Sequence, residues 1–401
     1  MGRLLRVLAV LVALGLVVTA NYLRPIDAVA ASPILPGDQR IPGQPPDLPW
    51  PVGGAAVAVP GIGLIGTHGE NSPRPMASVA KVMAALVVVA GHPLGPIEQG
   101  PTVTVTADDF ANYQKELAGG QSVVAVQVGE ALTQRQLLEG MLIPSGNNFA
   151  DLLARWDAGS VDGFVAKMNT DAARLGMRQS HFADPSGFSD QTVGTPSDLV
   201  LAGEAFMADP VLAQIVGQGQ VDLPVAGTSF NVDYALGSQG IVGIKTGSAP
   251  KAGACFLFAA TAKVGGKVAL VVGAVMDEPT LDDAFTASEK LIAAIVPALK
   301  LVPAVSASEA VAEYRAPWGS RTGLIAQKDI SLLAWPGMIL HRRVNAPAVQ
   351  PPLSDGQSVG SFAAWVGSGP PLSVPLATDG PLFEPGNVWR LTRPLGDTRY
   401  D

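Results

Sequence analysis

The chain has 401 residues, 48% of them hydrophobic and 15% charged, and its formal net charge is −8. A chain of this length can bury a sizeable core and is typical of about two domains. The acidic balance, together with the lack of a dense Lys/Arg run, excludes the basic surface that nucleic-acid binding requires. We therefore expect no nucleic-acid partner.

The first 31 residues are predicted to direct export. Arg3 and Arg6 precede an uninterrupted apolar run, residues 7–20, which suits the core of a signal peptide and is short for a membrane span of about 20 residues. Small residues at 28–30 offer a cleavage site, but they lie some way beyond the apolar run. Residues 1–31 are therefore either a signal peptide or a retained N-terminal membrane anchor, and the bulk of the chain is exported in both cases.

The next segment, residues 32–53, is dense in proline and glycine and is expected to form an extended linker. The fold then begins near Gly54, where "AAVAVPGIGLIG" predicts two short strands joined by a Pro-Gly turn. A helix is expected to open at Ser78. The only cysteine, Cys255, rules out an internal disulfide and is expected to be a buried structural thiol.

A helical region is predicted for roughly residues 130–216. Thr133 and Gln136 form a T-x-x-Q capping box before an apolar run. Ser160 precedes a second segment with helical spacing, which Gly176 can close.

Strands return after the helical region. Two apolar segments on either side of Val264-Gly265-Gly266 predict a β-hairpin, and residues 281–299 predict an amphipathic helix. Strands at both ends of a helical middle indicate an α+β domain, residues 54–300, with one antiparallel sheet. Residues 301–401 contain short strand-like pieces cut by Pro and Gly and predict a separate small β-rich domain. The lack of a long amphipathic helix near the C-terminus argues against a C-terminal membrane anchor.

Ser78 and Lys81 stand at i and i+3 at the start of an apolar helix, "PMASVAKVMAALVVVA", so that their side chains share one face. A serine becomes a nucleophile when a base takes its proton, and an unprotonated lysine can be that base. The pKa of Lys81 would have to fall from roughly 10.4 to near 7, a change of about 4 kcal/mol. Burial, the helix N-terminus and a neighbouring cation all act in that direction.

Ser145 and Asn147 lie in a tight connection between two helices, "MLIPSGNNFADLLARW". A hydroxyl there could pass a proton, and a carboxamide could bind a substrate amide. Plain helix capping by Ser and Asn is the alternative interpretation of this stretch.

Lys245, Thr246 and Gly247 enter a strand-like segment, "GIVGIKTGSAPKAGACFLF". Gly247 leaves room for an extended substrate backbone beside the strand, and Lys245 offers a cation to a substrate carboxylate and to Lys81. Successive side chains of a strand point to opposite faces of the sheet, so Lys245 and Thr246 should point to opposite faces. Both can reach one site only if that site lies along the strand edge. A solvated lysine at a strand start is the alternative.

Other matches to these patterns are weaker. Ser248 and Lys251 also form S-x-x-K, but Pro250 denies them a helix interior, and Ser229 with Asn231 lacks a helix-turn-helix setting. The four histidines show no zinc-ligand spacing, so no metal and no cofactor are expected.

Ser-x-x-Lys, Ser-x-Asn and Lys-Thr-Gly in this order resemble the penicillin-binding protein and serine β-lactamase superfamily. Within it, the surrounding sequences look like the low-molecular-weight D-alanyl-D-alanine carboxypeptidases over most of residues 54–296, and residues 301–401 are similar to the β-rich C-terminal domain of some members. The resemblance implies a β-lactamase/transpeptidase-like catalytic domain followed by a small β-rich domain.

The resemblance also implies a role for each motif residue. Ser78 would be the acylated nucleophile, Lys81 its general base and Ser145 a proton relay. Asn147 would contact the substrate amide, and Lys245 with Thr246 would bind the terminal carboxylate of the substrate. Gly247 and Ser248 would also belong to the substrate-binding site. Backbone N–H groups of Ser78 and Ser248 would form the oxyanion hole.

The implied substrate is a peptidoglycan stem peptide ending in D-Ala-D-Ala, with β-lactams as covalent inhibitors, at the cell wall or the outer face of the cytoplasmic membrane. Three alternatives stay open: a D,D-endopeptidase acting on cross-links, a β-lactamase, and a non-catalytic cell-wall or β-lactam-binding protein. The class A β-lactamase pattern Glu-x-x-Leu-Asn is absent from the sequence. Oligomeric state is left undecided.

Overall fold

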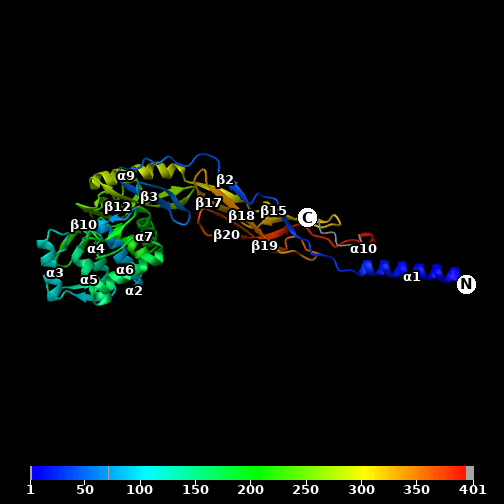
Figure 1. Cartoon of the computed structure of the whole chain (residues 1–401), viewed down its shortest axis with the longest axis horizontal. Coiled ribbons are helices and arrows are strands. Elements are labelled where there is room, and N and C mark those ends of the chain that lie inside the picture. Colours follow the sequence, from blue (N-terminus) through cyan, green and yellow to red (C-terminus); the bar gives the residue numbers. More distant parts are fainter. Residues whose placement is uncertain (1, 71, 394–401) are drawn as a thin grey trace. The chain divides into compact units, whose positions relative to one another are not determined.

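The computed structural model describes residues 2–70 and 72–393, which form two compact units (Figure 1). One unit is Gln44–Lys300. The other combines the chain up to Gly43 with the chain from Leu301 onward.

The Gln44–Lys300 unit contains a five-stranded antiparallel sheet in the order β11-β12-β13-β3-β4. Its strands are β3 (Gly54–Val59), β4 (Gly63–His68), β11 (Ile241–Ala249), β12 (Gly253–Val264) and β13 (Lys267–Glu278). The predicted turns at Pro60-Gly61 and Gly265-Gly266 therefore join neighbouring strands. The sheet unites the two ends of the unit, as expected for the α+β class.

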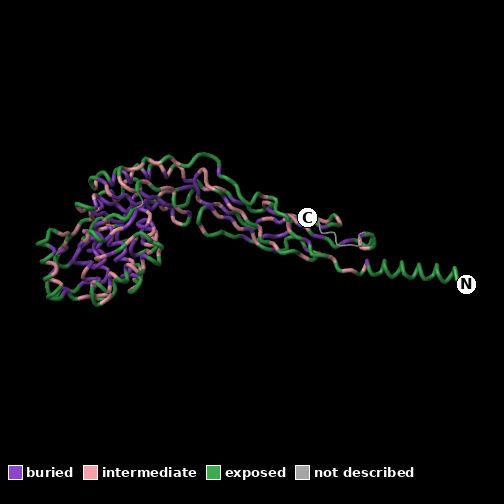
Figure 2. The backbone as a smooth tube through the Cα atoms, in the orientation of Figure 1, coloured by how far each residue is buried: buried purple, intermediate pink, exposed green. Residues whose placement is uncertain are grey.

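Helices cover both faces of this sheet. On β12, Leu257 lies close to Gly203 of α7 (Pro196–Ala208), whereas the adjacent Phe256 packs edge-on against Phe285 of α9 (Leu281–Ile295). Because neighbouring residues of a strand point to opposite faces, α7 and α9 lie on opposite sides of the sheet. The unit thus has three layers, of which the buried sheet is the middle one (Figure 2).

The helical layer contains the remaining helices of the unit. They are α2 (Lys81–Gly91), α3 (Ala107–Ala118), α4 (Gln134–Leu142), α5 (Asn147–Ala158), α6 (Val161–Leu175) and α8 (Pro210–Val216). The predicted capping box of Thr133 and Gln136 is present, Ser160 caps α6, and Gly176 ends α6 in a left-handed conformation. Short strand pairs join the layers: β5 (Arg74–Pro75) with β8 (Val193–Gly194), β6 (Thr102–Thr104) with β7 (Ala131–Thr133), and β9 (Gln220–Leu223) with β10 (Gly227–Phe230).

The other unit is built around a seven-stranded antiparallel sheet in the order β1-β15-β16-β20-β19-β18-β2. The C-terminal part supplies β15 (Ala310–Arg315), β16 (Arg321–Ala326), β18 (Ile339–Asn345), β19 (Ser358–Val366) and β20 (Leu372–Asp379), and a separate pair is formed by β14 (Lys300–Val305) and β17 (Ile330–Ala334). Two helices complete it, α1 (Gly2–Leu23) and α10 (Asn387–Thr392).

The expected linker over residues 32–53 differs from the structure in its first part. β1 (Ala31–Pro33) pairs with β15, and β2 (Asp38–Arg40) pairs with β18, so this segment forms both edges of the C-terminal sheet. Proline is tolerated at such edges because it leaves no inward ladder bond unmade. The Pro-rich composition was therefore compatible with edge strands as well as with a linker.

Candidate active site

Ser78 and Lys81 meet across a tight turn at the start of α2. Ser78 lies in a 3-10 turn, Ala77–Ala80, and Lys81 begins the α-helix. Side chains at i and i+3 eclipse in a 3-10 turn, and the Lys81 Nζ lies 2.9 Å from the Ser78 Oγ. The preceding Ala77 has a φ of 47°, a strained value of the kind that clusters at functional sites.

The Lys81 ammonium is fully buried and surrounded by oxygen atoms. Its Nζ lies 2.6 Å from the Asn147 Oδ1, 3.1 Å from the Ser186 carbonyl oxygen and 3.5 Å from the Ser145 Oγ. The first two oxygens can only accept. A neutral amine has two N–H donors and one lone pair. The two acceptor oxygens would take the two N–H groups, so the lone pair stays available to accept from the hydroxyl of Ser78 or Ser145.

Burial lowers the pKa of Lys81 well below its usual value, and the nearby Lys245 lowers it further. Three carboxyl groups oppose this effect, Asp184, Glu116 and Asp151. Desolvation is the largest cause, because the charged form loses its hydration. The lysine is therefore disposed to be a base and not a permanent cation.

Ser145 and Asn147 are held in the α4–α5 connection close to this lysine. Ser145 has a φ of 67°, and a Cβ on Gly146 would lie 2.8 Å from the side chain of Val124, so the turn leaves no room for a side chain at 146. Both residues are almost fully buried. The strained turn directs both toward Lys81, and capping alone does not account for their position.

Gln121 is a site residue that the sequence motifs did not reveal. It lies in the loop after α3, and its Oε1 accepts a 2.6 Å hydrogen bond from the Asn147 Nδ2, while the Ser122 carbonyl accepts from the Asn147 backbone N–H. These bonds fix the Asn147 amide so that its oxygen faces Lys81. The only signal for this loop was its Gly119-Gly120 turn, which does not identify the polar residues that follow.

Lys245, Thr246 and Gly247 lie on β11 beside the Ser78 turn. Thr246 and Gly247 line the narrow part of the cleft, whereas Lys245 is 1% exposed and its Nζ donates to the Thr246 carbonyl. Burial lowers the pKa of Lys245 to about 7, and the nearby Asp233 opposes this. Strand alternation thus places the lysine beneath the site and the threonine in it.

Gly247 is required by packing against the Ser78 turn. A Cβ at this position would lie 2.7 Å from the backbone nitrogen of Ser78 and 3.1 Å from that of Val79. This reason differs from the expected one, which was space for a substrate backbone. Ser248 follows this glycine, and both Ser78 and Ser248 line the cleft.

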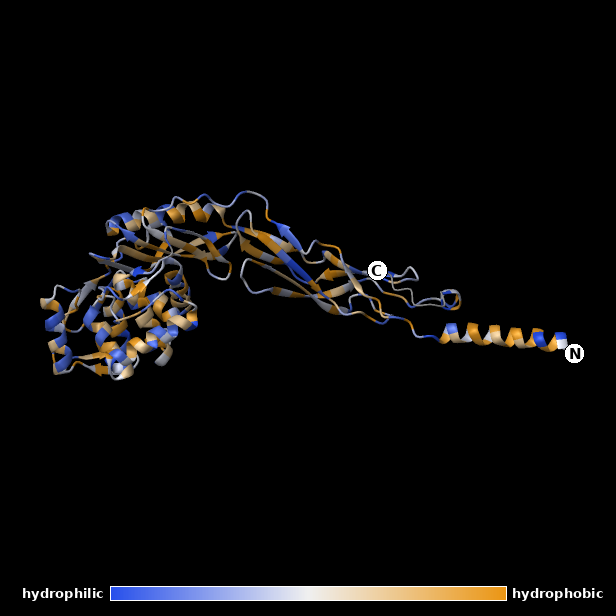
Figure 3. Cartoon of the chain, in the orientation of Figure 1, coloured by the Kyte–Doolittle hydropathy of each residue, from blue (hydrophilic) through white to orange (hydrophobic). Residues whose placement is uncertain are grey.

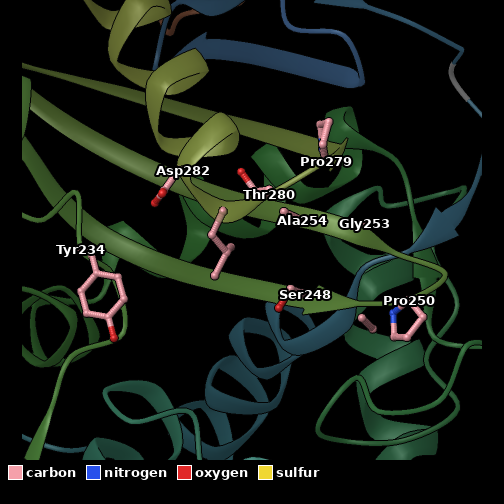
Figure 4. A pocket seen from close by; sticks show the side chains of 10 residues that line it. Tyr234, Ser248, Pro250, Gly253, Ala254, Pro279, Thr280 and Asp282 are labelled. Carbon is pink, nitrogen blue, oxygen red and sulfur yellow. The ribbon is translucent and has the colours of Figure 1, made fainter.

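The cleft has three adjoining hollows that share Ser248. A hollow of about 600 Å³ is lined by Ser78, Gln121, Asn147 and Phe188, and a narrow one of about 220 Å³ by Ser78, Ser145 and Thr246. An outer hollow of about 750 Å³ lies between β11, the start of α9 and the exposed ring of Tyr234 (Figure 4). The narrow and outer hollows also share Tyr234 and Leu281.

The weaker motif matches have structural explanations. Lys251 lies in the β11–β12 turn and forms a 2.7 Å ion pair with Asp190. Asn231 donates its side-chain N–H groups to the carbonyls of Val216 and Gln218. Cys255 is buried and its thiol lies near the Ala252 carbonyl, as expected for a structural thiol.

A buried lysine beside a serine, under an S-x-N turn and a K-T-G strand, defines a serine hydrolase of the acyl-transfer class. A sequence model of the family described as "Peptidase_S11: D-alanyl-D-alanine carboxypeptidase" matches residues 64–280. The chain belongs to this D-alanyl-D-alanine carboxypeptidase family.

Individual proteins agree with this assignment. A D-alanyl-D-alanine carboxypeptidase of Mycobacterium tuberculosis, DacB2, is 36% identical over 202 residues, which are 48% of this chain and 64% of that protein. The crystal structure of the Streptomyces K15 DD-transpeptidase aligns with a TM-score of 0.55 and 27% identity over 62% of this chain and 98% of its own.

One further structure extends the likeness in fold. Penicillin binding protein 5 from Haemophilus influenzae aligns with a TM-score of 0.62 over 85% of this chain and all of its own, at 20% identity. The coverage of 85% takes in more than the catalytic unit. The fold class, an α+β catalytic domain followed by a β-rich domain, is therefore confirmed.

Proposed function

We propose that the protein is a serine-type D-alanyl-D-alanine carboxypeptidase that removes the terminal D-alanine from peptidoglycan stem pentapeptides. The single observation that carries the proposal is the 2.9 Å separation between the Ser78 Oγ and the Nζ of a fully buried Lys81. The proposal includes export of the catalytic unit to the cell wall or the outer face of the cytoplasmic membrane, where this substrate lies.

In the first step, the Ser78 hydroxyl gives its proton to the neutral Lys81 amine, and the Oγ attacks the carbonyl of the penultimate D-alanine. The oxyanion that forms accepts from the backbone N–H groups of Ser78 and Ser248. Ser145 lies 3.5 Å from the Lys81 Nζ and relays that proton to the leaving amine. D-Alanine departs, and an acyl-enzyme ester on Ser78 remains.

Hydrolysis then restores the enzyme. A water molecule gives a proton to Lys81 and attacks the ester carbonyl, and the released Ser78 oxygen takes a proton back. Asn147 holds the acyl-side amide of the substrate, and Thr246 binds the terminal carboxylate in the narrow hollow. Lys245 lies under Thr246 and adds positive charge there whenever it is protonated, although it does not line the hollow.

The test is intact-protein mass spectrometry after incubation with a penicillin, followed by an assay for D-alanine release from a D-Ala-D-Ala pentapeptide. We expect one antibiotic mass on Ser78, none in Ser78→Ala, and normal labelling in the control Ser229→Ala. Label at Ser229 or Ser248 would overturn the assignment. Fast nitrocefin turnover without a lasting adduct would indicate a β-lactamase, and an adduct without D-alanine release a binding protein.

A D,D-endopeptidase is a second candidate, and the outer hollow favours it. That hollow of about 750 Å³ adjoins the narrow one that would hold the leaving group, so a larger leaving group than D-alanine has room. Incubation with a purified cross-linked dimer of stem peptides decides between the two. Cleavage of the dimer faster than of the pentapeptide would establish the endopeptidase.

A further inference from the structure

The residues just after α1 are built into the C-terminal unit. The guanidinium of Arg393 donates to the carbonyl oxygens of Asn21 at 2.7 Å and Pro25 at 3.1 Å, and also to that of Arg24. In return, the Asn21 side chain donates to the carbonyls of Leu391 at 3.2 Å and Arg393 at 3.1 Å. Asn21 is only 6% exposed, so this reciprocal Asn21–Arg393 contact is part of the folded unit.

The segment between α1 and β1 is equally structural. The buried Val29 exchanges two backbone hydrogen bonds of 2.9 Å with Val349, and β1 then pairs with β15. Cleavage at the small residues 28–30 would remove the Asn21–Arg393 contact and one side of the Val29–Val349 pair. It would leave the Arg393 guanidinium without the carbonyl partners around which it is buried, which is costly for a charged group.

α1 extends beyond the apolar run 7–20, which alone is short for a membrane span, and the whole helix is long and apolar enough to cross a membrane. Its 22 residues extend about 33 Å, and a typical hydrocarbon core is about 30 Å thick. Over 18 consecutive residues of α1 the mean hydropathy is 2.2, and 6% of these residues are buried. Between its two ends the helix is apolar (Figure 3), and residues 2–20 are exposed (Figure 2). Arg3 and Arg6 at its start favour an N-terminus in the cytoplasm and hence an exported remainder.

Beside the end of α1, the C-terminal segment exposes apolar and aromatic side chains. We define the α10 surface as Phe383, Val388, Trp389 and Leu391. Phe383 is 64% exposed, Val388 75% and Leu391 43%. The Trp389 ring lies against the Trp318 ring and under the Arg393 guanidinium. Tryptophan with arginine is typical of the membrane–water interface.

We propose that α1 stays on the mature protein as its membrane anchor, and that the α10 surface rests in the headgroup layer of the bilayer that α1 crosses. The Asn21–Arg393 contact ties the exit of the anchor to this surface. The proposal is independent of the chemistry at Ser78.

The first test is the N-terminus of the mature protein, isolated from membranes of the native host and identified by intact mass and N-terminal sequencing. We expect the residues of α1 to be present and the protein to stay in the pellet after an alkaline carbonate wash. A mature chain that begins after Leu23 would overturn the proposal.

Variants test the Asn21–Arg393 contact. In Arg393→Ala, added protease is expected to cut residues 24–30 at least tenfold faster than in wild type. Arg390→Ala is the matched control, because Arg390 lies on α10, three residues before Arg393, and pairs with Glu384 instead. If Arg393→Ala does not fold by circular dichroism, Asn21→Ala replaces it, because this substitution removes no charge. The rate of cleavage at residues 24–30 is expected to rise in Asn21→Ala as well. Wild-type resistance of a folded variant would contradict the contact.

Fluorescence tests the α10 surface. The full-length protein is reconstituted in vesicles of phosphatidylethanolamine and phosphatidylglycerol with brominated acyl chains. We expect the brominated chains to quench the tryptophan fluorescence of the protein. This quenching should decrease in Trp389→Phe and be kept in Trp365→Phe, a control on β19. Equal quenching in the two variants would show that Trp389 does not reach the bilayer.

Discussion

Gly247→Ala is the substitution for which the structure gives the sharpest expectation. The new methyl carbon would lie 2.7 Å from the Ser78 backbone nitrogen, and ordinary contact begins near 3.4 Å. The Ser78 turn and β11 would therefore have to move apart by about 0.7 Å, and backbone on both sides gives little room for this.

Two effects are expected from this displacement. Overpacking of this kind costs about 1–3 kcal/mol, which lowers the melting temperature of a unit of this size by about 2–10 °C. The two N–H groups of the oxyanion hole also separate, and a misplacement near 1 Å costs about 10²-fold in rate. We expect acylation by penicillin to be about 10–100-fold slower.

The assay is the second-order rate of fluorescent penicillin labelling, with a thermal melt of the same samples. Gly219→Ala is the control, because a Cβ at 219 meets no atom within 4 Å and shares only the backbone-entropy gain of a glycine substitution. Labelling of Gly247→Ala within threefold of wild type would refute the reasoning, whatever the melting temperature.

Substitutions at three positions test Lys81 and its surroundings. Lys81→Arg should fold normally but lose at least about 10³-fold in acylation rate, because a guanidinium does not become the base; a rate within tenfold of wild type would place the proton elsewhere. Gln121→Ala should slow acylation about tenfold by freeing the Asn147 amide, whereas Gln121→Glu keeps the acceptor oxygen and should keep most of the rate; equal losses would remove the positioning role. Burial raises the pKa of Glu116 from 4.5 to about 7. The contribution of the protonated carboxyl group to the stability of the fold is therefore complete below pH 4.5 and is lost as the pH rises through 7. Glu116→Gln should therefore gain melting temperature relative to wild type between pH 4 and pH 8, and a constant difference would contradict the shift.

The elements that could be predicted from the sequence are those with local signals. The Gly265-Gly266 hairpin, the capping box at Thr133 and the helix end at Gly176 each follow from a few neighbouring residues. The pairing of β1 with β15 and of β2 with β18 could not be predicted in this way. Each strand has three residues, and their partners lie about 280 and 300 positions along the chain. Such pairing depends on tertiary packing and leaves no pattern within the strand itself.

The candidate site shows the same division. Ser78 with Lys81 and Ser145 with Asn147 belong to short motifs, and the structure brings their side chains together. The fourth partner of Lys81 is the carbonyl of Ser186, an atom that every residue possesses, and no motif identifies it. Gln121 likewise reaches Asn147 across 26 residues through a loop of ordinary composition.

The pKa of Lys81, the proposed base, is the least local property of the site. Burial by the α2 packing and the positive charge of Lys245 on β11 lower its pKa, whereas Asp184, Glu116 and Asp151 raise it from a loop, α3 and α5. Glu116 in turn is affected by Asp151, since burial and that neighbour raise its own pKa. The proton affinity of the base is thus a balance among groups from five segments. A motif can indicate a candidate nucleophile and a candidate base, but only the assembled fold determines how readily that lysine accepts a proton.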